Sequence, residues 1–191
     1  ACLCSGVVPT DWCAAVVCPL FKGDVASDPQ GSMEVDNYRG ISLTSCVGKL
    51  LEKIIARRME KHVAIAAPLC ETQNGFRPKR NSISHVWSLL EALAQRGPNA
   101  LALFFDLRKA FPSVRRSSLL VALHRRGVQG RLWRLVASFY RGTAGVVRVS
   151  DYVDIEAYPV SNGVKEGSLL SPLLFVLFID DLLRAVRQAG L

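Results

Sequence analysis

The chain of 191 residues is half hydrophobic, so it is long enough and apolar enough to bury a core, and this composition excludes a disordered or fibrous protein. Its formal charge of +8 indicates a polyanionic partner, either nucleic acid or an anionic membrane surface. No segment reaches the ~18 apolar residues of a membrane span, and residues 1–9 lack the basic start of a signal peptide.

The six cysteines do not follow the spacing of a metal site, because none forms a Cys-x-x-Cys pair and no pair of histidines follows at zinc spacing. We therefore expect free thiols in a reducing, intracellular setting, either the nucleus or the cytoplasm. The chain does not begin with Met, which suggests a piece of a longer protein. The cysteines are Cys2, Cys4, Cys13, Cys18, Cys46 and Cys70.

The N-terminal third is predicted to contain a strand, a loop and a helix. Residues 14–20 form a short Val-rich apolar run typical of a strand, and residues 22–37 form a polar loop interrupted by Pro and Gly. Residues 47–63 repeat apolar side chains at helical spacing, with Thr44 or Ser45 as the cap and a basic opposite face.

The middle of the chain predicts a second helix and a buried strand. Residues 83–93 show helical spacing, and Gly97 follows as a stop signal. Residues 100–105 are continuously apolar, which predicts a strand buried on both faces that ends at Asp106.

The C-terminal part predicts more helices and a hairpin. A long helix begins with Ser171 as its cap and Pro172 in its first turn, and it ends at Gly190. This mixture of helices with a few strands favours an α+β fold with helices packed on a small sheet. The other predicted elements are two helices, each followed by Gly, and the two strands of the hairpin: residues 117–126, 131–141, 146–149 and 155–158.

The stretch Leu-Phe-Phe-Asp-Leu-Arg-Lys-Ala-Phe over residues 103–111 carries the clearest chemistry. A carboxylate held at the end of a strand, here Asp106, can bind Mg²⁺, which prefers one or two carboxylates plus substrate phosphates. Lys109 could meet those phosphates, and Phe111 could lie against a sugar and exclude its 2′-hydroxyl. The alternative is a strand-end Asp that only caps the next turn.

Five blocks in this order resemble the reverse transcriptases of non-LTR retrotransposons, and the match covers nearly the whole chain without large gaps. The first runs from Pro9-Thr10-Asp11-Trp12 to Pro19-Leu20-Phe21-Lys22-Gly23-Asp24. The others are Asn37-Tyr38-Arg39-Gly40-Ile41-Ser42-Leu43 with the helix start at residues 48–53, Gln73-Asn74-Gly75-Phe76-Arg77, the Asp106 strand, and residues 163–172.

The resemblance implies a role for each block. Asp106 matches the first catalytic, metal-binding Asp, with the backbone carbonyl of Leu107 as a second ligand, and Mg²⁺ (or Mn²⁺ in its place) as the cofactor. The implied substrate-binding residues are Lys22, Arg39, Leu107, Lys109, Ala110, Phe111, Lys165, Glu166 and Gly167. The implied template-binding residues are Gln73, Phe76, Arg77, Gly163, Ser171 and Pro172. Without the resemblance, the lysines and arginines are ordinary solvated charges, the glycines are turn residues and Phe76 is a core aromatic.

The implied fold is the α+β right-hand polymerase type: a fingers portion over residues 1–99 and a partial palm over residues 100–191, with helices packed on a small antiparallel sheet. The implied activity is RNA-directed DNA synthesis with an RNA template, a DNA primer and a dNTP. The alternative is a non-catalytic RNA- or DNA-binding module derived from a polymerase. Glu166 stands where the family usually has Gln, and an ionised Glu only accepts hydrogen bonds.

Phe178-Ile179-Asp180-Asp181 resembles the aromatic-x-Asp-Asp box that supplies the remaining catalytic carboxylates of the family. That box lies on a tight hairpin, whereas this pair falls inside the predicted C-terminal helix, with Asp180 four residues before Arg184. We therefore interpret both aspartates as structural and expect the true box, and the thumb, beyond residue 191. A chain with Asp106 alone is predicted to be inactive by itself, because two-metal phosphoryl transfer needs several carboxylates.

Overall fold

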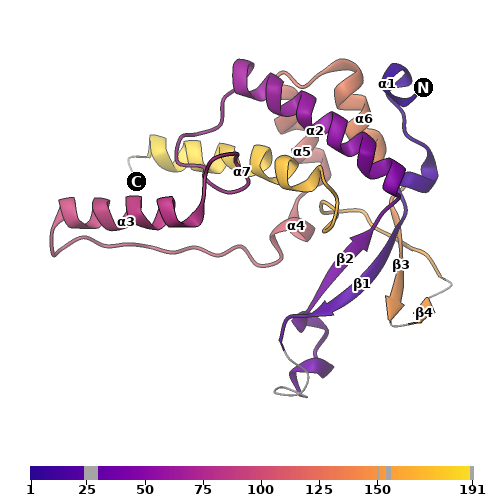
Figure 1. The fold of residues 1–191 in the computed structure, drawn as a ribbon, viewed down its shortest axis with the longest axis horizontal. Helices are drawn as coiled ribbons and strands as arrows, with labels where there is room; N and C mark the ends of the chain where they lie inside the picture. Colours follow the sequence, from indigo (N-terminus) through magenta and orange to yellow (C-terminus); the bar gives the residue numbers. More distant parts are fainter. Residues whose placement is uncertain (24–29, 150, 154–155, 190–191) are drawn as a thin grey trace.

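The computed structural model describes residues 1–23, 30–149, 151–153 and 156–189 (Figure 1). The helices are α1 (Cys2–Ser5), α2 (Cys46–Ala66), α3 (Ser82–Arg96), α4 (Ala110–Ser113), α5 (Arg116–Arg125), α6 (Gly130–Tyr140) and α7 (Ser171–Gln188). The strands are β1 (Ala15–Phe21), β2 (Tyr38–Leu43), β3 (Ala144–Val149), β4 (Tyr152–Val153) and β5 (Tyr158–Pro159). Short 3₁₀ turns occupy Thr10–Trp12, Gly31–Met33 and Val35–Asn37.

The sheet is small and mixed. Its strand order is β2-β1-β3-β4, and β5 also pairs with β3. β1 and β2 form an antiparallel hairpin in which Phe21 pairs with Tyr38, but β1 and β3 run parallel. The prediction of an antiparallel sheet is therefore wrong for this one pairing. A parallel pair needs a long crossover, and the helices between β1 and β3 provide it.

The helices α2, α5, α6 and α7 supply most of the core and pack mainly against one another, while the hairpin of β1 and β2 extends away from them (Figure 1). Ile55 and Met59 of α2, Leu123 of α5 and Leu177 of α7 have no exposed surface. Burial of one such side chain contributes about 1.5–3 kcal/mol. The amphipathic spacing of these helices therefore determines where the core lies.

The predicted helices are confirmed. Ser45 caps α2, because its hydroxyl accepts a hydrogen bond from the Gly48 N–H at 3.3 Å. Gly97 ends α3 with a φ of 79°, a left-handed value that glycine adopts readily. The helix α7 runs without interruption through Asp180 and Asp181.

Two boundaries differ from the predictions. Ser171 is the first residue of α7 rather than its cap, although Pro172 does lie in the first turn. The second strand predicted at residues 155–158 is represented by β5, and β4 forms the hairpin with β3. The predicted helix end at Gly190, together with residues 24–29 of the polar loop and residue 155, lies outside the described residues.

The predicted buried strand at residues 100–105 is wrong for this structure. The segment has no regular secondary structure, and Leu101, Phe104 and Phe105 are 82–92% exposed. A strand is stable only when neighbouring strands satisfy its backbone, and no strand among the described residues pairs with this segment. The adjacent α3 also buries none of its side chains. In the described part of the chain, no helix is long and apolar enough to cross a membrane.

Candidate functional site

Three basic side chains gather around Asp36. Its carboxylate accepts hydrogen bonds from the Arg108 guanidinium and the Lys109 ammonium, each at 2.6 Å. The Lys22 ammonium donates to the backbone carbonyl of Asp36 at 2.7 Å. The hydrogen bond from Lys109 and the charges of Lys109 and Arg108 lower the pKa of the Asp36 carboxyl. We call Lys22, Arg108 and Lys109 the cation cluster.

The hairpin of β1 and β2 explains how Lys22 reaches Asp36. The Phe21 and Tyr38 rings pack with centroids 5.3 Å apart, and the Lys22 N–H then bonds to the Asn37 carbonyl. Because Asp36 immediately precedes Asn37, this register brings it beside Lys22. Arg39 lies opposite Leu20, so it is exposed at the same end of the hairpin.

The other half of the cluster comes from the turn before α4. Lys109 adopts a φ of 50°, a left-handed conformation that costs a non-glycine residue about 1–2 kcal/mol. This turn separates the extended segment that contains Asp106 from Ala110, the first residue of α4. Asp106 therefore lies on the same segment as Arg108 and Lys109, two of the three members of the cation cluster.

Asp106 and Leu107 are exposed, so their oxygens are open to a cation. Among the described residues, no three His, Cys, Asp or Glu side chains gather in a group that could enclose a metal. The one carboxylate and the Leu107 carbonyl nevertheless fit Mg²⁺, which keeps several waters and takes substrate phosphates as ligands. They would hold one ion together with a phosphorylated ligand.

Phe111 links three segments through ring contacts. It stacks on Phe175 of α7 at a centroid distance of 5.1 Å and meets the edge of Phe76 at 6.1 Å. Phe76 itself is 64% exposed, so it is not a buried core residue. These contacts place residues 73–77 next to α4. In the sequence, α4 directly follows Arg108 and Lys109 of the cation cluster.

The remaining predicted template residues of the 73–77 segment have local partners. Arg77 donates to the carbonyls of Cys70 and Gln73, both at 3.1 Å. The Gln73 amide reaches the Gly75 carbonyl at 3.4 Å. The Arg77 guanidinium therefore holds the loop that presents Phe76.

Residues 163–167 lie between β2 and α4 and form hydrogen bonds to both regions. The Gly163 N–H donates to Val114 at 2.8 Å, and a side chain at position 163 would come within 2.8 Å of the Pro112 backbone. The Glu166 carbonyl accepts from the Ser42 N–H, and a Cβ at Gly167 would lie 2.6 Å from the Ser42 carbonyl oxygen. Only glycine permits these approaches.

Lys165 does not lie where a nucleotide-binding role would place it. It is 7% exposed, and its ammonium donates to the Cys13 carbonyl at 2.8 Å. Burial lowers the pKa of this ammonium. Contact between Lys165 and a bound nucleotide would require this buried bond to break, so the structure favours a structural role. Ser171 is also buried, and Pro172 is half-buried, at the start of α7.

Sequence reasoning missed several residues that support this site. Glu52 of α2 is 4% exposed and accepts from the Ser168 hydroxyl and the Leu169 N–H. Arg116 of α5 donates to the carbonyls of Gly163, Tyr140 and Val160. Glu52 could have been found from the sequence, because it is a charged residue on the apolar face of a predicted helix. Asp36 could have been found because its carboxylate directly precedes the motif that begins at Asn37.

Asp180 and Asp181 lie within α7 and not on the tight hairpin that a catalytic pair of this type occupies. Asp180 is fully buried and accepts from the Cys70 N–H at 2.7 Å, Arg126 at 2.7 Å and Arg184 at 2.8 Å. Burial by itself would raise the pKa of Asp180, but these three donors together lower it. Asp181 accepts from the same Arg126 at 2.8 Å. The predicted position of both aspartates inside the C-terminal helix is confirmed.

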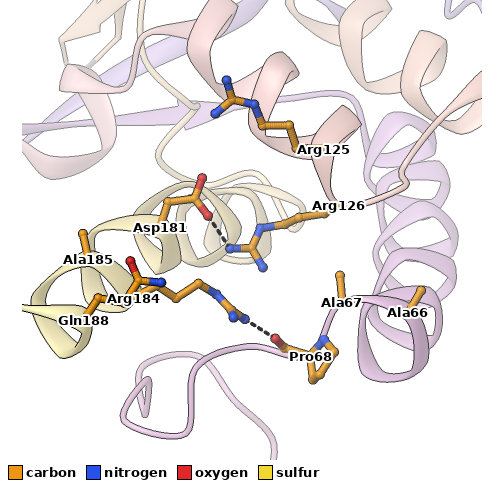
Figure 2. A pocket seen from close by; sticks show the side chains of 9 residues that line it. All are labelled: Ala66, Ala67, Pro68, Arg125, Arg126, Asp181, Arg184, Ala185 and Gln188. Carbon is orange, nitrogen blue, oxygen red and sulfur yellow. Dashed lines mark hydrogen bonds and ion pairs between the residues drawn. The ribbon is translucent and has the colours of Figure 1, made fainter.

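Figure 2 shows the part of this network that lines a surface pocket of about 650 Å³, namely Asp181, Arg126 and Arg184. Arg126 points from α5 toward Asp181 on α7, and Arg184 bonds to the carbonyl of Pro68 in the segment after α2. The aspartates therefore join α5, α7 and the end of α2.

Comparison with known proteins identifies the family to which the chain is similar. Residues 26–190 match the family model for reverse transcriptase (RNA-dependent DNA polymerase). The chain is 31% identical over 190 residues to a 115 kDa protein of the type-1 retrotransposable element R1DM from Drosophila melanogaster, covering 97% of the chain and 17% of that relative.

Two other relatives also come from transposable elements. The chain is 28% identical to the Pol polyprotein of the type-1 retrotransposable element R2 from Popillia japonica, covering 97% of the chain and 25% of the relative. It is 27% identical to the RNA-directed DNA polymerase from the mobile element jockey of Drosophila melanogaster, covering 93% of the chain and 19% of the relative. It thus spans a quarter or less of the length of these relatives. The chain belongs to the reverse transcriptase family of non-LTR retrotransposons.

Proposed function

We propose that this chain is the part of an RNA-directed DNA polymerase that binds the incoming dNTP and the templating strand. The observation that carries the proposal is the cation cluster beside Asp106. Lys22, Arg108 and Lys109 converge from two segments more than 80 residues apart and bring three positive charges to the single carboxylate of Asp36. Such a cluster suits the phosphates of a nucleoside triphosphate.

In this proposal each group has a defined task. The cation cluster and Arg39 bind the phosphates and orient the α-phosphate toward the primer 3′-hydroxyl, which attacks it and releases pyrophosphate. Phe111, held between Phe76 and Phe175, would lie against the deoxyribose and exclude a 2′-hydroxyl. Bound Mg²⁺ supplies charge neutralisation at the phosphates. The cofactor and the division into fingers and palm are part of this proposal.

The templating strand would cross the face that carries Phe76. This exposed ring offers a stacking surface for a base, an interaction of about 1–3 kcal/mol. Residues 163–167, which β2 and the α4 segment hold in place, would lie beneath the templating base. The net charge of +8 supports binding to a phosphate backbone.

We further propose that the 191-residue chain does not polymerise DNA by itself. The two aspartates that resemble a catalytic pair are held in α7 by Arg126 and Arg184. Among the described residues, no three His, Cys, Asp or Glu side chains gather in a group that could hold the ions of a two-metal site. This observation also favours the second candidate function, a polymerase-derived binding module without catalysis.

The nucleotide site can be tested by equilibrium binding of dTTP to the chain on a poly(rA)·oligo(dT) primer-template with Mg²⁺. Loss of one charge-assisted hydrogen bond in Lys109→Gln should weaken dTTP binding about ten- to a hundredfold, which corresponds to roughly 1.5–3 kcal/mol. Lys53→Gln is the matched control, since it removes the same charge from the exposed face of α2. Equal effects of both variants would contradict the proposed site.

Primer extension on the same primer-template separates the two candidate functions. The chain alone should bind the primer-template without extending it. Incorporation above a protein-free control that Asp106→Ala abolishes would show that this chain already contains a complete catalytic site.

A further inference from the structure

The Asp36 carboxylate binds two members of the cation cluster with a geometry that a phosphate group could also adopt. Its two carboxylate oxygens each bind one cation, Oδ2 with Arg108 and Oδ1 with Lys109, both at 2.6 Å. A phosphate group offers the same pair of oxygens to two donors. Asp36 therefore takes up donors that the proposed function assigns to the triphosphate.

We propose that Asp36 is an acidic latch that competes with the nucleotide's triphosphate for the cation cluster and is displaced when the triphosphate binds. The inference rests on the proposed function, because it concerns the same site. It adds a regulation of that site: without a triphosphate, the cation cluster is paired with a residue of the chain itself.

The latch connects two distant parts of the chain. Asp36 lies in the 3₁₀ turn Val35–Asn37 before β2, whereas its partners lie 72 and 73 residues later, before α4. The Lys22 bond to the Asp36 carbonyl adds a third contact from the end of β1. Displacement of Asp36 would therefore free the tip of the hairpin from the Asp106 segment.

Solvent exposure makes the latch reversible. The side chains of Asp36, Arg108 and Lys109 are 55%, 81% and 53% exposed. Exposed ion pairs are weak, because water and salt screen the attraction. A triphosphate carries several negative charges and can exceed the single charge of Asp36 at the same donors.

An ordinary surface ion pair elsewhere in the chain serves as a comparison. Glu71 pairs with Arg80 at 2.9 Å, and its side chain is 74% exposed. Unlike Asp36, Glu71 pairs with a single arginine away from the cation cluster. Glu71→Gln therefore reproduces the change in net charge of Asp36→Asn without opening the latch.

The test uses inorganic tripolyphosphate as the probe, with its dissociation constant measured by calorimetry for the chain, Asp36→Asn, Glu71→Gln and Lys109→Gln. If the latch is closed for nine-tenths of the time, Asp36→Asn should lower the apparent dissociation constant about tenfold. Glu71→Gln should leave it nearly unchanged, and Lys109→Gln should raise it. The gain from Asp36→Asn should shrink as salt concentration rises.

Amide exchange supplies an independent readout. Residues 31–37 should exchange faster when tripolyphosphate is added to the chain, and equally fast without it in Asp36→Asn. If Asp36→Asn binds tripolyphosphate no better than Glu71→Gln, or binds it more weakly, the latch is wrong, and weaker binding would make Asp36 an organiser of the cluster.

Failure of the proposed function would look different. Tripolyphosphate has no base or sugar, so the latch can be detected even if the chain does not select a dNTP. A latch effect with tripolyphosphate, combined with dTTP binding that ignores the primer-template, would retain the latch and reject the polymerase nucleotide site. Normal dTTP binding without a latch effect would retain the polymerase nucleotide site and reject the latch.

Discussion

Replacement of Asp180 by Asn should destabilise the chain severely, although the substitution changes only one atom of the side chain. Asp180 is 0% exposed and its carboxylate accepts from three donors that belong to three separate segments. Two of those donors are the guanidinium groups of Arg126 and Arg184, and the third is the Cys70 N–H. Asn removes the charge and turns an NH₂ group toward at least one donor.

The size of the effect follows from burial. Arg126 is 7% exposed, so loss of the buried Asp180 charge leaves its guanidinium with only the half-exposed Asp181 as a counter-charge. Breaking a buried ion pair by removal of one partner costs about 3–5 kcal/mol. With a total stability of roughly 5–15 kcal/mol, this is a large share of the free energy of unfolding. At an m-value of roughly 2 kcal/mol/M, the urea midpoint should fall by about 2 M.

Asp181→Asn is the matched control on the next residue. Asp181 is 52% exposed and has a single contact with Arg126. Exposed ion pairs contribute about 0–1 kcal/mol, so the midpoint should move by less than about 0.5 M.

Urea titrations followed by far-UV circular dichroism measure both variants against the parent chain. Similar midpoints for Asp180→Asn and the parent, or equal losses in the two variants, would refute the argument that burial makes Asp180 structural. A catalytic role for the pair would instead predict normal stability with altered activity.

Three further outcomes are expected. Because donors lower the pKa of folded Asp180, its contribution is present above the unfolded Asp pKa of about 3.9 and is lost as pH falls below it, so acid titration should unfold the parent chain more steeply than Asp180→Asn. Gly167→Ala, with φ of 107° and a Cβ 2.6 Å from the Ser42 carbonyl, should cost on the order of 3 kcal/mol in thermal or urea unfolding. Gly130→Ala, with φ of 62° and open space, should cost only about 1–2 kcal/mol, and equal costs would contradict the steric argument. Duplex DNA binding should weaken with salt at a log–log slope of about −0.9 per phosphate contact, and a flat slope would exclude a backbone-binding surface.

Local signals in the sequence predicted the helices because helix formation depends on neighbours three and four residues apart. The apolar repeat of α2 and its Ser45 cap, the Gly97 stop after α3 and the Pro172 start of α7 all appear in the structure. The same spacing identified Asp180 as a helical residue paired with Arg184. The ordered blocks of motifs identified the family, which the comparisons confirm.

Non-local pairing decided the rest, because a strand is stable only with neighbours that a local pattern does not specify. Residues 100–105 have the composition of a buried strand, yet they lie exposed without a partner among the described residues. The parallel pairing of β1 with β3 likewise depends on how the intervening helices return the chain. Side-chain partners followed from the same packing: the sequence marked Lys165 as a ligand for a nucleotide, and only the tertiary structure shows its ammonium buried against Cys13. Asp36 drew no notice in the sequence, because the cations around it come from segments 14 to 73 residues away and meet only after the hairpin and α4 have folded together.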